Sequence, residues 1–208
     1  MHQPAPHRRD DPASLYALVR AWPLGLICRA GAAGLAADHI PFLLDAEAGV
    51  LRAHVARANP LWREAANSGV LVVFHDSGAY VSPGFYPSKR EHGKVVPTWN
   101  YAAVHVHGVL RAIEDRDWLS GLVGALTAEH EKHEPNPWRV GDAPPDFIEQ
   151  MLGAIVGIEI RIGRIEGKWK ASQNRSDADR AGVSRGLRAR GDEASLRMAA
   201  LVDEARRA

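Results

Sequence analysis

The sequence has very little cysteine, since Cys28 is the only one among its 208 residues. One thiol cannot form an internal disulfide, and its position in the apolar run PLGLICRA favours a buried structural role. Long apolar runs are also absent, because no stretch approaches the roughly 20 residues that a membrane-spanning helix needs. The basic start MHQPAPHRR continues into Asp10 and Asp11 instead of an apolar segment, so we expect no secretory signal and a cytoplasmic protein.

A strong excess of one charge is missing as well. The 26 lysines and arginines nearly balance the 25 acidic residues, which gives a net charge of +1. This balance argues against the broad basic surface that drives nucleic-acid affinity, so any anion site must be local. No helix-turn-helix pattern is present, and the Arg-rich C-terminal tail is interrupted by acids. We therefore expect no direct reading of DNA. The tail's arginines are Arg180, Arg185, Arg188 and Arg190.

The familiar catalytic and nucleotide-binding motifs are absent too. The chain has no GxGxxG, Walker, GxSxG, paired CxxC or HExxH pattern. The string EHEKHE at residues 129–134 contains two histidines, but the solvated end of a helix explains it better than a metal site. His105 and His107 lie on one strand face without a third ligand at a suitable spacing. We assign no metal site and no catalytic residue, and the sequence leaves open whether the protein is an enzyme.

Antiparallel strands dominate the pattern that is present. Between Leu24 and Asp76 short apolar runs alternate with turn residues. A long strand is predicted over residues 101–113, and a second over 155–165, where isoleucines alternate with charged residues. Four helices are predicted, at residues 12–22, 60–67, from Asp115 onward and at 144–153. We expect a mainly β protein with added helices, folded as an antiparallel barrel of six or seven strands.

The length fits one hydrophobic core, so we expect a single domain over residues 1–208. Residues 1–10 would form a polar N-terminal arm, and residues 175–208 an Arg-rich helical tail.

Four strings gather polar and aromatic side chains where strands end or the chain turns, places that often carry function. They are HVARANP, AYVSPGFYPSKR, VPTWNY and GKWKASQNR, the last of which we place just after the final strand. An arginine beside a helix start, such as Arg57, could hold a phosphate, although a plain surface arginine fits that position equally well. Rings, amides and cations together would suit a planar cofactor with a phosphate tail, or could simply cover a barrel mouth or a dimer seam.

These strings, together with LVRAWPLG, GLAADHIPFLLD and APPDFIEQMLGAIVGIEI, resemble the PaiB family of FMN-binding negative transcriptional regulators. The resemblance runs from about Leu15 to Val202. It implies an FMN-binding split barrel of Greek-key type, related to pyridoxamine-phosphate oxidases, in which two subunits pair and FMN lies in their seam. It also implies FMN, in preference to FAD or pyridoxal phosphate, as the cofactor.

The resemblance further implies which residues meet the cofactor. Arg57 and Lys89 are the expected phosphate ligands, and the polar or ring-bearing residues of the second and third strings are the expected flavin neighbours. The full set of expected cofactor-binding residues is His54, Arg57, Tyr80, Ser82, Lys89, Thr98, Trp99, Asn100, Lys168, Gln173 and Asn174. Three functions remain open: a flavin-binding regulator, an FMN-dependent oxidoreductase acting on a small molecule, or a plain flavin carrier.

Overall fold

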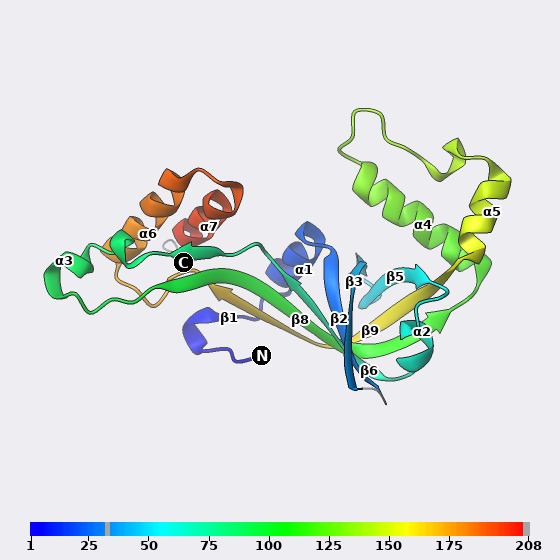
Figure 1. Cartoon of the computed structure of the whole chain (residues 1–208), viewed down its shortest axis with the longest axis horizontal. Coiled ribbons are helices and arrows are strands. Elements are labelled where there is room, and N and C mark those ends of the chain that lie inside the picture. The colour runs from blue at the N-terminus through cyan, green and yellow to red at the C-terminus, as the bar shows by residue number, and fades with distance from the viewer. Residues whose placement is uncertain (32–33, 206–208) are drawn as a thin grey trace. The chain divides into compact units, whose positions relative to one another are not determined.

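The computed structural model describes residues 1–31 and 34–205, which divide into two compact units. The terminal unit combines Met1–Leu18, His75–His105 and Glu166–Ala208. The central unit combines Val19–Phe74 and Val106–Ile165. Figure 1 labels their helices and strands. Both units are assembled from separate stretches of chain, and the prediction of a single domain over residues 1–208 stays a prediction.

The central unit is an antiparallel sheet with short helices at its connections. Its strands are β2 (Leu24–Gly31), β3 (Gly34–Pro41), β4 (Leu43–Asp45), β5 (Val50–Ala56) and β6 (Gly69–His75), with parts of β8 (Thr98–Ile113) and β9 (Ile155–Lys170). The sheet order is β3-β2-β6-β8-β9-β5-β4, and β3 also contacts β5. These seven strands match the predicted number and the mainly β class. Two shorter strands of the terminal unit lie off this path.

Alternating burial explains why these segments form strands. Leu51, Ala53 and Val55 of β5 are almost fully buried, while the residues between them are partly exposed. On β9, Ile158 and Ile160 are buried and alternate with charged residues, as the period-2 pattern predicted. The register of β5 against β9 runs from Val50↔Arg161 to Ala56↔Ile155. One apolar face of the sheet thus forms the core of this unit.

The helices of the central unit are α2 (Leu61–Glu64), α4 (Arg116–Glu131), η3 (Val140–Asp142) and α5 (Pro145–Gly153), together with the end of α1 (Pro12–Ala21), whose first residues belong to the terminal unit. Asp115 caps α4 by accepting a hydrogen bond from the backbone of Trp118 at 2.8 Å, which confirms that predicted start. The helix predicted at residues 60–67 is wrong in its extent. It ends at Glu64, and Asn67 takes a left-handed conformation with φ of 55°, which a continuing helix does not allow.

The terminal unit is built from the chain ends and one middle segment. It contains η1 (Ala5–His7), β1 (Arg8–Arg9), β7 (Ala79–Val81), η2 (Pro83–Phe85), α3 (Ser88–His92), α6 (Asp177–Arg190) and α7 (Glu193–Glu204). The start of β8 and the end of β9 complete it. β7 pairs with β8 from Ala79↔Asn100 to Val81↔Thr98.

Two predictions about the chain ends are wrong. Residues 1–10 are not a plain arm, because Arg8 and Arg9 pair with Lys168 and Gly167 as strand β1, and His7 is buried. This pairing helps to extend β9 to Lys170, so the segment from residue 168 to 170 lies in the strand and not after it. The partner strand comes from the other end of the sequence, and no local pattern could reveal it.

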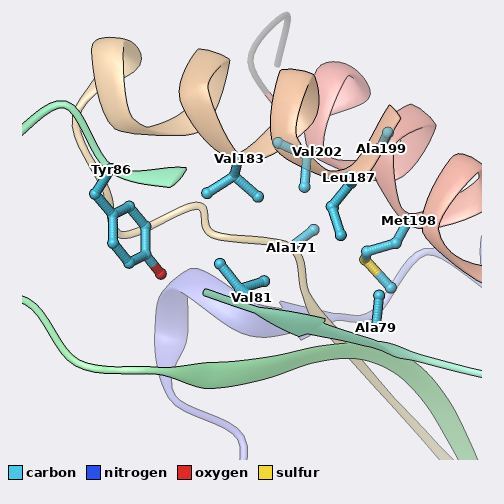
Figure 2. Packing of buried hydrophobic residues seen from close by; sticks show 9 residues of the cluster. All are labelled: Ala79, Val81, Tyr86, Ala171, Val183, Leu187, Met198, Ala199 and Val202. Atoms are coloured by element: carbon cyan, nitrogen blue, oxygen red, sulfur yellow. The ribbon is translucent and has the colours of Figure 1, made fainter. Parts of the chain in front are cut away.

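The Arg-rich tail folds as the predicted helices, and these pack onto the terminal unit. Figure 2 shows Val183 and Leu187 of α6 on the side of Val81 of β7, and Met198 of α7 facing Ala79. All members of this cluster are buried: Ala79, Val81, Tyr86, Ala171, Val183, Leu187, Met198, Ala199 and Val202. The terminal unit therefore has an apolar core of its own.

Candidate functional site

The predicted cofactor-binding residues lie in both units. His54 and Arg57 belong to the central unit, at the end of β5 and just after it. The others belong to the terminal unit: Tyr80, Ser82, Lys89, Thr98, Trp99, Asn100, Lys168, Gln173 and Asn174. The structure brings four members of this second group, Thr98, Asn100, Lys168 and Gln173, to the end of β9.

Three cations gather at the end of β9. The Lys170 ammonium is half-buried and donates a hydrogen bond to Oγ1 of Thr98. Burial lowers the pKa of Lys170, and the positive charges of Lys168 and Arg175 lower it further. The other two cations lie over aromatic rings, with Lys168 Nζ 5.4 Å from the Tyr101 ring centre. The charges therefore repel one another in a partly desolvated place.

This group, which we call the β9 cation cluster (Lys168, Lys170 and Arg175), lacks an acidic partner. Within residues 1–31 and 34–205, no ion pair joins any of the three to a carboxylate. Keeping like charges together in a half-buried place costs free energy unless an anion compensates them. Lysine and arginine donors at such spacing suit a phosphate group. The arrangement is thus fitted to an anionic ligand.

A buried polar pair lies beside this cluster. Asn100 is fully buried and donates from Nδ2 to Oγ of Ser172 at 2.9 Å, and Ser172 is itself buried. Oδ1 of Asn100 has no hydrogen-bond partner among the described residues. An unpaired buried acceptor costs roughly 1 to 3 kcal/mol, so the site is suited to a ligand that brings an N–H donor.

An exposed aromatic pair stands on the neighbouring strands. Tyr80 of β7 and Trp99 of β8 are cross-strand partners, and their ring centres are 6.2 Å apart in an edge-to-face arrangement. Trp99 is 57% exposed, which is unusual for so large an apolar side chain. Lys89 on α3 and Asn174 after β9 are also exposed.

Three predicted residues are occupied by contacts within the chain. Ser82 caps η2 by accepting from the Gly84 backbone at 3.1 Å. The Gln173 amide accepts from Ala171 N and donates to Trp169 O, each at 2.7 Å. Arg57 donates to the carbonyls of Gly153 and Ile155 and forms an ion pair with Glu114. These bonds hold the local backbone and leave less donor capacity for a phosphate.

The central unit offers a second, smaller polar site. A hollow of about 380 Å³ is lined by residues of β3 and β5, including Asp38 and His54, and by Asn59. Asn59 donates to Asp38 at 2.9 Å, while its carbonyl oxygen accepts from the Leu61 backbone at 2.8 Å. Burial lowers the pKa of His54, and its buried Nδ1 atom has no partner among the described residues. This ring therefore favours the neutral form.

Sequence reasoning did not select Lys170, Ser172 or Arg175, although all three lie in the string GKWKASQNR. A signal was available, because lysines two positions apart share one face of a strand. This signal was missed because we predicted that residues 168–170 follow the strand. Outside a strand, residues two positions apart do not share a face.

Comparisons with known proteins agree on the family. Residues 1–164 match the family model described as "Putative FMN-binding domain". The chain is 36% identical over 152 residues to the protease synthase and sporulation protein PAI 2 of Bacillus subtilis, with 73% of this chain and 70% of that protein covered. It is 35% identical to an uncharacterized protein of Emericella nidulans, with 98% of this chain and 97% of that protein covered.

Solved structures agree on the fold. The FAD and heme binding protein from Mycobacterium smegmatis superposes with a TM-score of 0.62 at 18% identity, covering 84% of this chain and 79% of that one. The flavocytochrome Anf3 from Azotobacter vinelandii gives a TM-score of 0.58 at 15% identity, covering 84% and 74%. No helix in the described part of the chain is long and apolar enough to span a membrane. The protein belongs to the FMN-binding split-barrel family that includes PAI 2, and FMN is its cofactor.

Proposed function

We propose that the β9 cation cluster holds the phosphate of FMN in a protein whose role depends on the bound flavin. The observation that carries this proposal is the gathering of Lys168, Lys170 and Arg175 without an acidic partner. A phosphate dianion would offset their repulsion and accept their N–H donors. The hydroxyl of Thr98, already bonded to Lys170, would be a further donor at the same place.

The neighbouring polar groups fit the rest of the cofactor. The open acceptor on Asn100 matches a ring N–H donor, whereas Trp99, the preceding residue of β8, points to the opposite face and offers apolar surface there. When bound, FMN supplies reversible uptake of electrons. Asn100 and Ser172 would orient the ring edge, and the cations would fix the tail.

The role of the bound flavin is regulatory in this proposal. The support is the relative PAI 2, which is named for protease synthesis and sporulation. The effect would pass through the flavin state or a partner protein, because three of the four arginines of α6 are occupied by contacts within the terminal unit. FMN-dependent oxidation or reduction of a small molecule is the second candidate. Adding NADH or NADPH separates the two, since an oxidoreductase bleaches the flavin absorbance with turnover and the regulator does not.

The proposal includes a homodimer. Leu35 on the edge strand β3 is 89% exposed and Leu24 on its neighbour β2 is 60% exposed, and apolar exposure on an outer strand favours association. Light scattering of the wild type should report two chains, and Leu35→Lys should shift the protein toward monomer. A wild-type monomer with FMN bound would contradict the dimer.

The phosphate site is tested with charge-removing variants in both units. Lys170→Gln should raise the Kd for FMN by roughly tenfold to a hundredfold, the loss expected for one charge-assisted hydrogen bond. The matched control is Lys94→Gln, an exposed lysine of the same unit that lies outside the cluster. FMN fluorescence quenching gives Kd directly. An unchanged Kd in Lys170→Gln together with a raised Kd in Arg57→Gln would move the phosphate to the central unit.

A further inference from the structure

A second hollow, of about 530 Å³, opens in the central unit and is lined by none of the predicted flavin residues. Its walls come from the end of α1 and the residues after it, from Phe42 and strand β4, and from the last turn of α4 with the residues that follow. The string EHEKHE, which we interpreted above as the solvated end of a helix, supplies one side of it. Volumes of roughly 300 to 1,000 Å³ are typical of small-molecule sites.

The hollow has an apolar side and a basic side. Phe42 and Leu44 are buried, with 3% and 8% of their surface exposed, and Pro23 is half-buried beside them. The basic groups that line it are exposed: Arg20, His130, Lys132 and His133. A ligand there would meet hydrocarbon on one side and N–H donors on the other.

One carboxylate, Glu129, faces these cations, and it is already paired. Lys132 donates to Glu129 at 2.5 Å, and this hydrogen bond lowers the pKa of Glu129, with His130 and Arg20 adding smaller effects of the same sign. After this pair is set aside, the guanidinium of Arg20 keeps an uncompensated charge. Within the described part of the chain, the Arg20 guanidinium forms no direct ion pair with a carboxylate.

The C-terminus of α4 explains only part of this arrangement. Lysine and histidine near the last turn of a helix are favoured by its dipole, which accounts for His130 and Lys132. Arg20 comes from α1, and the dipole of α4 does not require an apolar wall next to it. A metal site does not fit either, because ligand atoms of these side chains do not converge as a group of three among the described residues.

We propose that this hollow binds a small organic carboxylate with an apolar body. Arg20 would hold the carboxylate through two parallel N–H donors, with His130 and His133 beside it, and the apolar body would cover Phe42 and Leu44. Inorganic phosphate satisfies the charge alone and would leave the apolar wall in water. This site is separate from the flavin proposal, because every lining residue belongs to the central unit and none is in the β9 cation cluster.

Isothermal titration calorimetry of the FMN-loaded protein tests the proposal, with 4-phenylbutanoate as the probe. We expect saturable binding of this carboxylate, with at least tenfold weaker binding of the neutral 4-phenylbutan-1-ol and of inorganic phosphate. Arg20→Gln should weaken the carboxylate at least tenfold. Arg161→Gln is the matched control, because Arg161 is an exposed arginine of the same unit outside the hollow, and it should leave the affinity unchanged.

A second variant fills the hollow instead of removing charge. Ala21 is exposed and lines the hollow, so Ala21→Phe should block the probe without disturbing the core. FMN content and melting temperature should stay at wild-type values in both variants, which separates this result from any failure of the flavin proposal. Equal affinity for the carboxylate and the alcohol, absence of binding at millimolar probe, or binding that survives both variants would each overturn the inference.

Discussion

The arginines paired within the central unit and the cations at the end of β9 differ in their charged partners. In the central unit, Arg29 pairs with Glu64, Arg52 with Asp45 and Glu159, and Arg116 with Glu149. In the terminal unit, the β9 cation cluster gathers three positive charges without an acid. Cations that pair with carboxylates stabilise the fold. Half-buried cations without a carboxylate partner cost free energy until an anionic ligand binds. This difference favours the end of β9 as the place of the flavin phosphate in our proposal.

Two helix glycines, one in each unit, differ in how tightly they are enclosed. A Cβ atom on Gly182 of α6 would lie 2.1 Å from the carbonyl oxygen of Phe85, a backbone atom that cannot rotate away. A Cβ on Gly121 of α4 would meet nothing within 4 Å. The first glycine is required by close approach of α6 to η2, and the second is not required by any contact.

The largest effect is expected when the enclosed glycine is replaced by a larger residue. Gly182→Val should destabilise the terminal unit by about 3 kcal/mol, the upper end of the usual cost of overpacking, because helix α6 must move away from Phe85. Gly121→Val should change stability by less than about 0.5 kcal/mol, since both residues are modest helix formers and the site is open. Hydrogen exchange measured by mass spectrometry should show faster exchange in α6 and α7 only for Gly182→Val. Equal exchange in the two variants would contradict the claim of close packing.

A smaller effect is expected at Asp76, a buried carboxylate at the turn between β6 and β7. It accepts hydrogen bonds from the backbones of Gly78 at 3.1 Å and Ala102 at 3.0 Å. Asp76→Ala should cost about 1 to 3 kcal/mol, because it leaves these buried donors unpaired. Asp76→Asn keeps an acceptor oxygen and should cost less. Thermal melting compares the two variants.

The same carboxylate predicts a pH dependence with a definite sign. Burial raises the pKa of Asp76, so the folded state favours its protonated form. Its stabilising contribution is therefore complete below its ordinary pKa, and is lost as pH rises through the raised value. As pH rises from the ordinary pKa of an aspartate to the raised pKa of folded Asp76, the wild type should lose stability relative to Asp76→Asn. A difference in melting temperature that stays constant with pH would contradict this sign.

These sites show what the sequence could and could not predict. The alternation on β9 and the cap at Asp115 are local signals, and the strands and α4 follow from them. The pairing of Arg8 with Lys168 joins residues at opposite ends of the chain, so neither the length of β9 nor the cation cluster could follow from local pattern. The family resemblance identified the FMN cofactor, but residue types alone could not distinguish a free cation from a paired one.

Arg57 is a cation whose pairing could not be predicted from its residue type. The family resemblance implies that it binds phosphate, and the structure places its Nε atom 2.9 Å from the Gly153 carbonyl oxygen and its guanidinium against Glu114. Arg57→Ala should lower the free energy of unfolding by about 1 kcal/mol, because its hydrogen bonds are partly exposed. FMN affinity should change less than in Lys170→Gln. A larger loss of affinity in Arg57→Ala would reverse the contrast between the two units.

The smallest effect is expected for DNA. Arg180 and Arg188 of the C-terminal helices form ion pairs with Asp177 and Asp203. Arg190 donates to the Tyr80 carbonyl oxygen and lies over the Phe85 ring at 4.9 Å. Arginines held in this way neutralise few phosphates, and each neutralised phosphate would add about one unit of salt dependence. We therefore expect weak duplex binding without sequence preference.

A fluorescence anisotropy titration at physiological salt measures this directly, using a promoter fragment and random DNA of equal length. The two duplexes should bind equally weakly, and replacing Arg185 and Arg188 by alanine should change the Kd by less than about twofold, since a loss of one effective phosphate contact is a small term at this salt. Tight binding to the promoter fragment alone, lost in the double variant, would show that the helices read DNA. Their ion pairs would then have to open on binding, and the affinity would fall steeply as salt rises.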